Sequence, residues 1–371
     1  MELYFTIHIL VFLCCLFDFS KTAIKTKRKI ILLWCIFFTL FGGLRWEIGS
    51  DWDQYYEHFL NCEWSNIFSY DRYGNGVETL EPGFVFINAT IKYLFGEFYW
   101  YNLIIVGFIQ YTYYKFSFEF SHKYPILMYA LLILLATAYF PVRAGLALGV
   151  VYWSYRYIRD RQLKKFLLVI CCAGMIHNQC FALLPFYWAG HIKLNLVSAS
   201  IIYLLFIIAA KIFQDYFIIL SAIIGGDLGD KMQSYTNFET EGFKGASYLG
   251  WGLNYFFLFI YFYIRKKCNY KNNLWYNTLI NIFITYNGLF IVFSNGMGDL
   301  TRLASAFFPA QAILFLFSMN YFLSSSNKRY AKLAILFYVL YYSYKITSIG
   351  SGYFFESTCI PYKTIFDYNI I

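Results

Sequence analysis

The sequence has 371 residues, of which 60% are hydrophobic and 24% aromatic, whereas only 14% are charged. A soluble domain has about 25% charged residues, so a soluble fold of this composition would expose too much apolar surface. The composition excludes a cytosolic globular enzyme, a disordered chain and a disulfide-stapled secreted domain. We therefore expect an all-α, polytopic integral membrane protein.

The net charge of +9 comes from basic clusters that lie between apolar segments. Binding of nucleic acid would require a continuous basic face with base-stacking aromatic residues, so we expect no nucleic-acid partner. In membrane proteins, short basic loops mark the cytoplasmic side. The clusters occupy residues 21–29, 156–165, 265–271 and 328–332.

Apolar segments of about the length that spans a bilayer occur along the whole chain. They predict 10–12 transmembrane helices in a single membrane-embedded domain, residues 1–371. The clear candidates are residues 2–19, 30–44, 98–116, 124–140, 142–158, 195–213, 248–264, 274–294, 303–323 and 333–349.

The rule that basic loops are cytoplasmic also decides how two further apolar segments are interpreted. An even number of crossings must separate two cytoplasmic clusters, so residues 84–95, which are short and contain Asn88 and Lys92, are predicted to lie in the interface. By the same parity, residues 166–190 must enter the membrane and return. Because residues 174–179 form a polar break, we predict a re-entrant hairpin with His177 at its outer tip.

This topology places residues 45–83 and 214–247, together with the turn 295–302, on the extracytoplasmic side. Arg45, Arg143 and His177 then lie near the outer ends of helices, as does Arg302 in that turn. The convergence of these cationic or titratable groups at one face is the main indication of a site.

The segment from Arg45 to Tyr55 follows an apolar helix directly and contains one arginine and three carboxylates, including Asp51. Arginine binds phosphate through its planar guanidinium, and a carboxylate binds sugar hydroxyls or acts as a general base. A solvated helix end, with Arg45 extending to the surface and tryptophans in the aromatic belt, explains the same residues.

The other candidates also have two interpretations. Glu81 either is a carboxylate near the bilayer that acts as a general base, or belongs to a turn that caps the following helix. His177 either is a functional group or is a core residue whose hydrogen bonds are satisfied within the protein. Arg143 lies near the start of an apolar helix with no acid close in sequence, which favours function over extension to the surface. Arg302 either binds a ligand or pairs with Asp299 one helical turn away.

Nucleotide-binding and metal-binding motifs are absent from the sequence. A phosphate-binding loop or a dinucleotide fingerprint needs glycines at fixed spacing, and a metal site needs paired Cys or His residues. We therefore expect no cofactor and no metal.

Several short motifs, in this order and spacing, resemble the EpsG-like polymerases of bacterial surface polysaccharide, which are grouped with the Wzy-type O-antigen polymerases. The resemblance extends over nearly the whole chain. Its motifs are Arg45-Trp-Glu-Ile-Gly-Ser-Asp51-Trp-Asp-Gln-Tyr55, Glu81-Pro-Gly-Phe84, Val142-Arg143-Ala-Gly-Leu-Ala147, Ile176-His177, the Arg302 turn and Pro361-Tyr362-Lys363.

The resemblance implies a membrane glycosyltransferase that polymerises undecaprenyl-diphosphate-linked oligosaccharide on the extracytoplasmic face of the bacterial cytoplasmic (inner) membrane. A chain-length regulator and a flippase are the expected protein partners. Under this hypothesis Arg45, Arg143 and Arg302 bind the diphosphate. Tyr55 also binds substrate, and Asp51, Glu81 or His177 is the base.

Two other functions remain open. A flippase or exporter of the same lipid-linked oligosaccharide would place its charges along a midplane cavity and show repeat symmetry. A ligase, or another glycosyltransferase that uses lipid-linked sugars, would give Asp51 and Asp53 a metal-binding or basic role.

Overall fold

The computed structural model describes residues 2–49, 51–72, 74, 79–135, 142–224, 242–293, 298–324, 332 and 359–368. Within these residues the regular secondary structure is helical, and extended pairing is limited to two isolated β-bridges, Arg45 with Thr364 and Asp71 with Thr79. The all-α fold class is therefore confirmed. The central part of the predicted loop 214–247, residues 225–241, lies outside the described residues.

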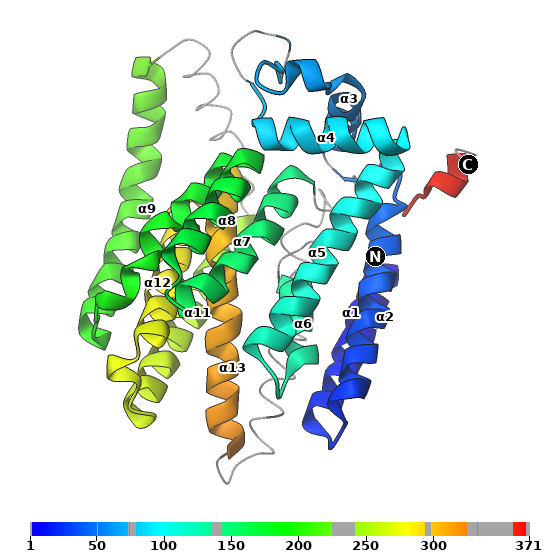
Figure 1. The fold of residues 1–371 in the computed structure, drawn as a ribbon. Helices are drawn as coiled ribbons and strands as arrows, with labels where there is room; N and C mark the ends of the chain where they lie inside the picture. Colours follow the sequence, from blue (N-terminus) through cyan, green and yellow to red (C-terminus); the bar gives the residue numbers. More distant parts are fainter. Residues whose placement is uncertain are drawn as a thin grey trace. The chain divides into compact units, whose positions relative to one another are not determined.

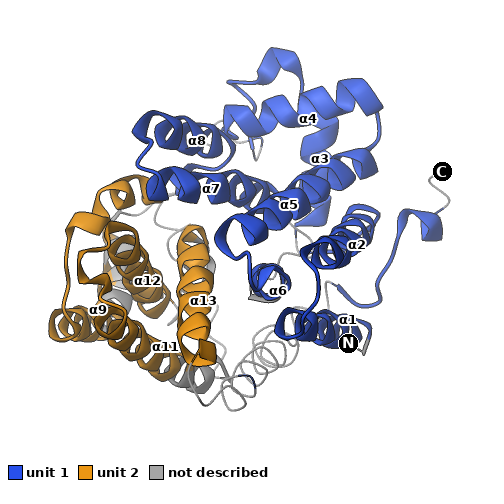
Figure 2. Cartoon of the chain, turned by 60° about the horizontal axis from the view of Figure 1, so that its bottom comes forward, with its two compact units in different colours: residues 1–181, 329–371 blue, residues 182–328 orange. Residues whose placement is uncertain are grey.

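The chain divides into two compact units (Figure 2). The first comprises residues 1–181 and 329–371, and the second comprises residues 182–328. The expectation that residues 1–371 form a single domain stays a prediction.

Successive long helices of the first unit run in opposite directions, so their connections alternate between its two ends (Figure 1). We call these the α4 end and the basic end; the turn before α2 and the turns after α5 and α7 lie at the basic end. The helices are α1 (Glu2–Cys15), η1 (Leu16–Phe19), α2 (Ile24–Gly43), α3 (Trp52–Asn61), η2 (Trp64–Asn66), α4 (Pro82–Phe95), α5 (Phe98–Phe120), α6 (Pro125–Leu135), α7 (Arg143–Arg159), α8 (Leu163–Ile176) and η7 (Ile365–Tyr368).

Small residues bring α2, α5 and α7 close together. A Cβ atom on Gly43 would lie 2.6 Å from Leu103 Cδ2, so α2 and α5 approach more closely than larger side chains permit. The helices α5 and α7 run parallel, and Trp153 Nε1 donates a 3.0 Å hydrogen bond to Thr112 Oγ1 between them. Close backbone approach at small residues is typical of helices packed in a membrane.

Helix α4 lies across the ends of the longer helices instead of alongside them (Figure 1). Phe84 and Val85 are buried, whereas Phe86, Tyr93 and Phe95 are exposed. Helix α4 is thus two-faced, and the position of residues 84–95 in the membrane interface stays a prediction.

Residues 166–190 form a helix followed by a non-α return. Helix α8 ends at Ile176, and the 3₁₀ helix η3 (Asn178–Tyr187) follows His177 directly. The chain folds back on itself here, because a Cβ on Gly174 would lie 2.2 Å from the Phe181 ring. The polar break therefore ends α8 at the position that the sequence predicts.

The second unit is organised around α12, which packs against α9, α11, α13, η4 and η6. Tyr276 donates a 2.9 Å hydrogen bond to the Tyr261 carbonyl between α12 and α11. Its elements after η3 are η4 (Ala189–His191), α9 (Leu196–Ile224), α11 (Gly242–Lys267), η5 (Tyr270–Asn272), α12 (Leu274–Phe293), η6 (Gly298–Phe307) and α13 (Phe308–Ser324). The helices α9 and α11 thus extend into the predicted loop 214–247.

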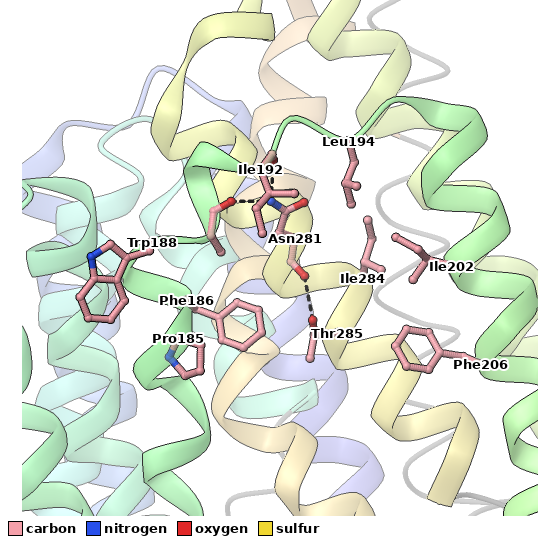
Figure 3. A pocket seen from close by; sticks show the side chains of 11 residues that line it. Pro185, Phe186, Trp188, Ile192, Leu194, Ile202, Phe206, Asn281, Ile284 and Thr285 are labelled. Carbon is pink, nitrogen blue, oxygen red and sulfur yellow. Dashed lines mark hydrogen bonds between the residues drawn. The ribbon is translucent and has the colours of Figure 1, made fainter.

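An apolar groove of about 480 Å³ lies in the second unit between η3–η4, α9 and α12 (Figure 3). Among its lining side chains are Phe186, Ile202, Phe206 and Ile284.

Two described helices are long and apolar enough to cross a membrane, Leu274–Phe293 and Leu303–Ser324. Shorter apolar helices cover Leu3–Phe19 and Leu196–Ala210. Large apolar side chains are also exposed along α2 and α9, as lipid contact requires; among these are Leu33, Ile36, Val197, Ile201, Leu204 and Leu205.

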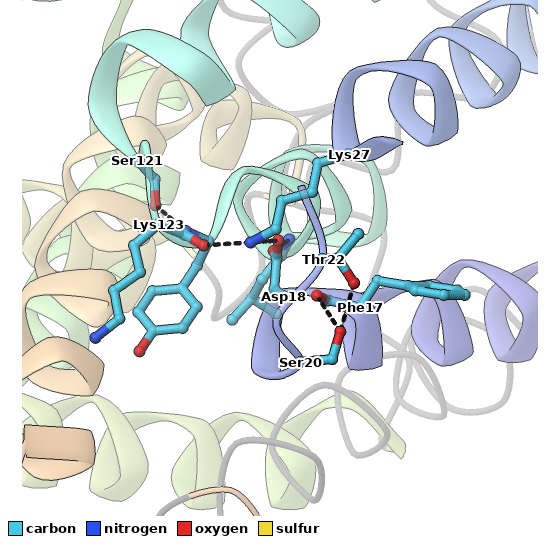
Figure 4. A network of polar contacts seen from close by, with 9 residues as sticks. Phe17, Asp18, Ser20, Thr22, Lys27, Ser121 and Lys123 are labelled. Atoms are coloured by element: carbon cyan, nitrogen blue, oxygen red, sulfur yellow. Dashed lines mark hydrogen bonds and ion pairs between the residues drawn. The ribbon is translucent and has the colours of Figure 1, made fainter. Parts of the chain in front are cut away.

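A buried ion pair joins η1, α2 and the start of α6 at the basic end (Figure 4). Lys27 Nζ lies 3.0 Å from Asp18 Oδ1 and donates a 2.7 Å hydrogen bond to the Lys123 carbonyl. The other carboxylate oxygen of Asp18 accepts a 2.8 Å hydrogen bond from the backbone N–H of Leu127. Asp18 therefore satisfies an N–H in the first turn of α6 that has no partner within the helix.

Candidate active site

Three helix termini meet at the α4 end of the first unit. Glu81 precedes α4 at the N-cap, Arg143 is the first residue of α7, and His177 is the C-cap of α8. Pro82 begins α4, and proline is favoured there because its missing N–H needs no partner in the first turn. Each of the three residues thus lies at a helix end, where the helix fixes the backbone on one side of the residue.

The carboxylate of Glu81 brings these termini together. Arg143 Nη1 donates a 2.9 Å hydrogen bond to Glu81 Oε2, and the backbone N–H of Asn178 donates a 3.3 Å hydrogen bond to Oε1. His177 Nδ1 lies 3.5 Å from the same Oε1. The predicted residues Glu81, Arg143 and His177 therefore form one cluster, which we call the Glu81 cluster.

The cluster is buried to different depths. The side chains of Glu81 and Arg143 are each 9% exposed, whereas that of His177 is 21% exposed. Low local dielectric strengthens the attraction between the buried ions and makes loss of either partner costly. His177 is the member that a ligand reaches most easily.

Close packing of α4 on α8 fixes Glu81 beside His177. A Cβ atom on Gly83 would lie 2.8 Å from the Met175 carbonyl oxygen and 2.9 Å from its Cβ. Real Cβ atoms do not approach backbone atoms this closely, so glycine is required at this contact.

Two further basic residues, His58 and Arg72, lie near the cluster. His58, at the end of α3, is buried, and its Nδ1 lies 3.1 Å from the Tyr70 hydroxyl. The pKa of His58 is lowered to about 4, mainly by burial and also by the charges of Arg72 and Arg143. His58 is therefore neutral near pH 7, and Arg72 adds a second guanidinium to this region.

Sequence reasoning did not single out His58, Arg72 or the N–H of Asn178. His58 and Arg72 have no unusual local spacing in the sequence, and a backbone N–H carries no sequence signal at all. The concentration of charged residues in the segment 45–83 was the only available indication.

Arg45 is buried, with 1% of its surface exposed. Its Nη1 donates a 2.7 Å hydrogen bond to the Gly42 carbonyl in the last turn of α2. A cation at a helix C-terminus stabilises carbonyl groups that have no partner in the helix. Arg45 is thus positioned to hold the end of α2 and does not reach the surface.

The C-terminal tail, residues 359–368, is attached along the segment that contains Arg45. The Trp46 N–H donates to the Lys363 carbonyl, and the Ile365 N–H donates to the Leu44 carbonyl, each at 3.1 Å. The Tyr362 ring stacks on Phe41 with their centroids 4.4 Å apart. The tail therefore fixes the backbone on both sides of Arg45.

Asp51 and Tyr55 lie on the segment between α2 and α4. Asp51 directly precedes α3 and is half-buried, and its carbonyl accepts the Tyr55 N–H at 3.1 Å. The Tyr55 ring centroid lies 6.0 Å from that of Phe84 and 6.0 Å from that of His58. Tyr55 thus packs beside the helix that Glu81 begins.

Arg302 lies in η6 of the second unit, and its side chain lies outside the described side chains. Its role stays a prediction. Among the described residues, no three side chains of His, Cys, Asp or Glu lie close enough together to hold a metal ion.

A family model described as the EpsG family matches residues 28–364, a range that includes every residue of the Glu81 cluster. The chain belongs to the EpsG family. This membership, which confirms the resemblance in the sequence motifs, indicates a membrane polymerase of exopolysaccharide or O-antigen type. No curated protein and no solved structure matches the chain.

Proposed function

We propose that this EpsG-family chain polymerises undecaprenyl-diphosphate-linked oligosaccharides as a multi-pass glycosyltransferase of the bacterial cytoplasmic membrane. The Glu81 cluster is the observation that carries this proposal, because it combines a fixed cation with a histidine held by a carboxylate. Transfer of a glycan from a lipid diphosphate requires stabilisation of the leaving diphosphate and removal of a proton from the acceptor hydroxyl.

The distribution of charge supports an extracytoplasmic site. The turns at the basic end contain Lys27, Lys123 and Arg159, whereas the Glu81 cluster lies at the α4 end. Under the positive-inside rule the basic end faces the cytoplasm. Lipid-linked repeat units and their acceptors then meet the cluster in the outer leaflet, with a flippase supplying them and a chain-length regulator acting on the product.

His177 is the proposed general base. Glu81 Oε1, 3.5 Å from His177 Nδ1, orients the ring and stabilises its charged form, as a carboxylate does beside a catalytic histidine. The acceptor hydroxyl oxygen forms the new bond to the anomeric carbon while the bond from that carbon to the diphosphate oxygen breaks. The hydroxyl proton goes to His177, and the bonding electrons leave with the diphosphate.

Arg143 is the proposed diphosphate ligand. Glu81 binds only its Nη1, and a guanidinium has five N–H donors. Arg302 stays a predicted diphosphate ligand, and Asp51 and Tyr55 are proposed to contact the sugars. Arg45 is assigned a positioning role, because its buried side chain binds the end of α2.

A gel ladder of surface polysaccharide tests the reaction class. A deletion strain complemented with the wild-type gene is expected to show the ladder, whereas the deletion shows single repeat units. Lipid-linked units trapped inside the cell would instead indicate a transporter and contradict the proposal.

Two histidine variants test the catalytic assignment. His177→Gln is expected to lower the rate of polymerisation by about 10²–10⁴-fold, the usual contribution of a general base. His122→Gln is the matched control, because His122 is exposed after α5 at the basic end. Equal ladders from both variants would remove His177 from the reaction.

A further inference from the structure

Two close glycine contacts fix the elements that line the groove of the second unit. A Cβ on Gly190 would lie 2.3 Å from Thr278 Oγ1, so η4 packs directly on α12 at this point. A Cβ on Gly288 would lie 2.2 Å from the Phe206 ring, so α9 packs on α12 at the other point. Ten residues of helix, about 15 Å, separate the two contacts.

Two polar side chains in the groove, those of Asn281 and Thr285, donate hydrogen bonds to the protein itself (Figure 3). Asn281 Nδ2 donates to the carbonyls of Ala189, at 2.6 Å, and Ile192, at 2.9 Å. Thr285 Oγ1 donates a 3.1 Å hydrogen bond to the Asn281 carbonyl. The remaining lining is apolar, so the groove suits a hydrocarbon chain and not a sugar or a phosphate.

The groove is flanked by an apolar surface on α9. Ile202 and Phe206 line the groove, and the neighbouring residues Ile201 and Leu205 are exposed. An exposed apolar stripe beside an apolar groove allows a lipid chain to enter sideways from the bilayer.

The η4 end of the groove is basic. Lys193 lies between the lining residues Ile192 and Leu194, and its Nζ donates to Asn272 Oδ1 at 3.0 Å. Arg265 Nη1 donates to the Leu194 carbonyl at 2.5 Å. Residues 182–210 and 250–293 contain no Asp or Glu; their basic residues are Lys193, Arg265, Lys266, Lys267 and Lys271.

An apolar groove that ends beside unbalanced positive charge is complementary to an anionic amphiphile. We propose that the groove binds one acyl chain of an anionic phospholipid, with its phosphate near Lys193 and the turn 265–271. This site is additional to the proposed polymerase site, and it lies in the cytoplasmic leaflet if the basic loops are cytoplasmic.

Native mass spectrometry of the purified full-length protein in detergent tests this proposal. We expect retained adducts of phosphatidylglycerol at concentrations where phosphatidylcholine with the same acyl chains does not bind. Equal retention of the two lipids would overturn the proposal. Displacement of phosphatidylglycerol by an equimolar polyprenyl diphosphate would also overturn it, because the groove would then prefer a prenyl chain.

Matched variants locate the binding site. Ile202→Trp fills the groove and is expected to abolish phosphatidylglycerol adducts, whereas Leu205→Trp, on the exposed stripe of the same helix, is expected to retain them. Unchanged adducts with Ile202→Trp would overturn the proposal.

A charge variant tests the headgroup without changing the groove. Lys193→Gln is expected to weaken phosphatidylglycerol binding about fivefold, since a lysine beside an anionic lipid contributes about 1 kcal/mol. Unchanged affinity would contradict the predicted position of the phosphate. The ladder of surface polysaccharide reports separately on the polymerase, so failure of either proposal is distinguishable from failure of the other.

Discussion

Arg143 Nη1 and Glu81 Oε2 lie 2.9 Å apart, although 62 positions separate the two residues in the chain. Neither residue has an opposite charge nearby in sequence. The structure supplies that partner by bringing the first residue of α7 close to the N-cap of α4. The pair therefore serves both the fold and the proposed chemistry, and variants must separate the two roles.

A double substitution separates stability from activity. Glu81→Gln alone leaves the Arg143 charge buried without its partner, which costs about 3–5 kcal/mol for a buried ion pair. Adding Arg143→Met removes the charge and is expected to recover much of the lost stability. The melting temperature in detergent measures this recovery, while the polysaccharide ladder is expected to stay absent. A ladder from the double variant would show that the pair is structural only.

Gly83→Ala tests whether the contact between α4 and α8 positions the cluster. The added methyl group would clash with the Met175 carbonyl, so α4 must move and carry Glu81 away from His177. We expect reduced polymer. Gly252→Ala in α11 is the control, because a Cβ at that position meets no atom within 4 Å. Alanine improves helix propensity by about 1 kcal/mol, so the control should be neutral or stabilising. Similar loss in both variants would contradict the positioning role.

Tyr362 variants test the attachment of the tail. Tyr362→Phe keeps the stack on Phe41 and loses the 2.5 Å hydrogen bond to the Phe41 carbonyl, a loss of about 1 kcal/mol. Tyr362→Ala also loses the stack and is expected to destabilise the protein further, but by less than the about 3–5 kcal/mol of a fully buried aromatic residue, because Tyr362 is half-buried. Thermal unfolding measures both effects. Equal melting temperatures for the two variants would indicate that the stack contributes nothing.

His58 predicts a dependence of stability on pH. Its pKa is about 4 in the folded protein, below its usual value of 6.5, so the unfolded chain binds more protons between these values. The contribution of His58 to the free energy of unfolding is then fully present above pH 6.5. It is lost as the pH decreases to 4, by a total on the order of 3 kcal/mol. Melting temperatures across this range, compared with those of His58→Gln, measure the effect. If the melting temperatures of the wild type and of His58→Gln change in parallel with pH, the role of His58 is refuted.

The sequence predicts much of this fold, because apolar length and basic loops act through the simple energetics of the bilayer. The crosswise helix α4 and the break at His177 were both predictable, since a short two-faced segment and a polar interruption do not span lipid as continuous helices. The contact between Glu81 and Arg143 was not predictable, because it depends on how two helices rotate and pack. The burial of Arg45 depends on a tail more than 300 residues away, which no local pattern indicates.

The bridge between Asp18, Lys27 and Leu127 has a consequence for biosynthesis. The N-terminal hairpin of α1 and α2 emerges from the ribosome long before α6. The Asp18 carboxylate therefore lacks the hydrogen bond from the Leu127 N–H until α6 has been synthesised. If the basic end faces the cytoplasm, as proposed above, the positive charge of Lys27 helps to retain this turn there before residue 127 has been synthesised. Once α6 has inserted, the same lysine joins the turn to the Lys123 carbonyl. Under the proposed orientation, a residue that directs topology during translation thus becomes part of the finished core.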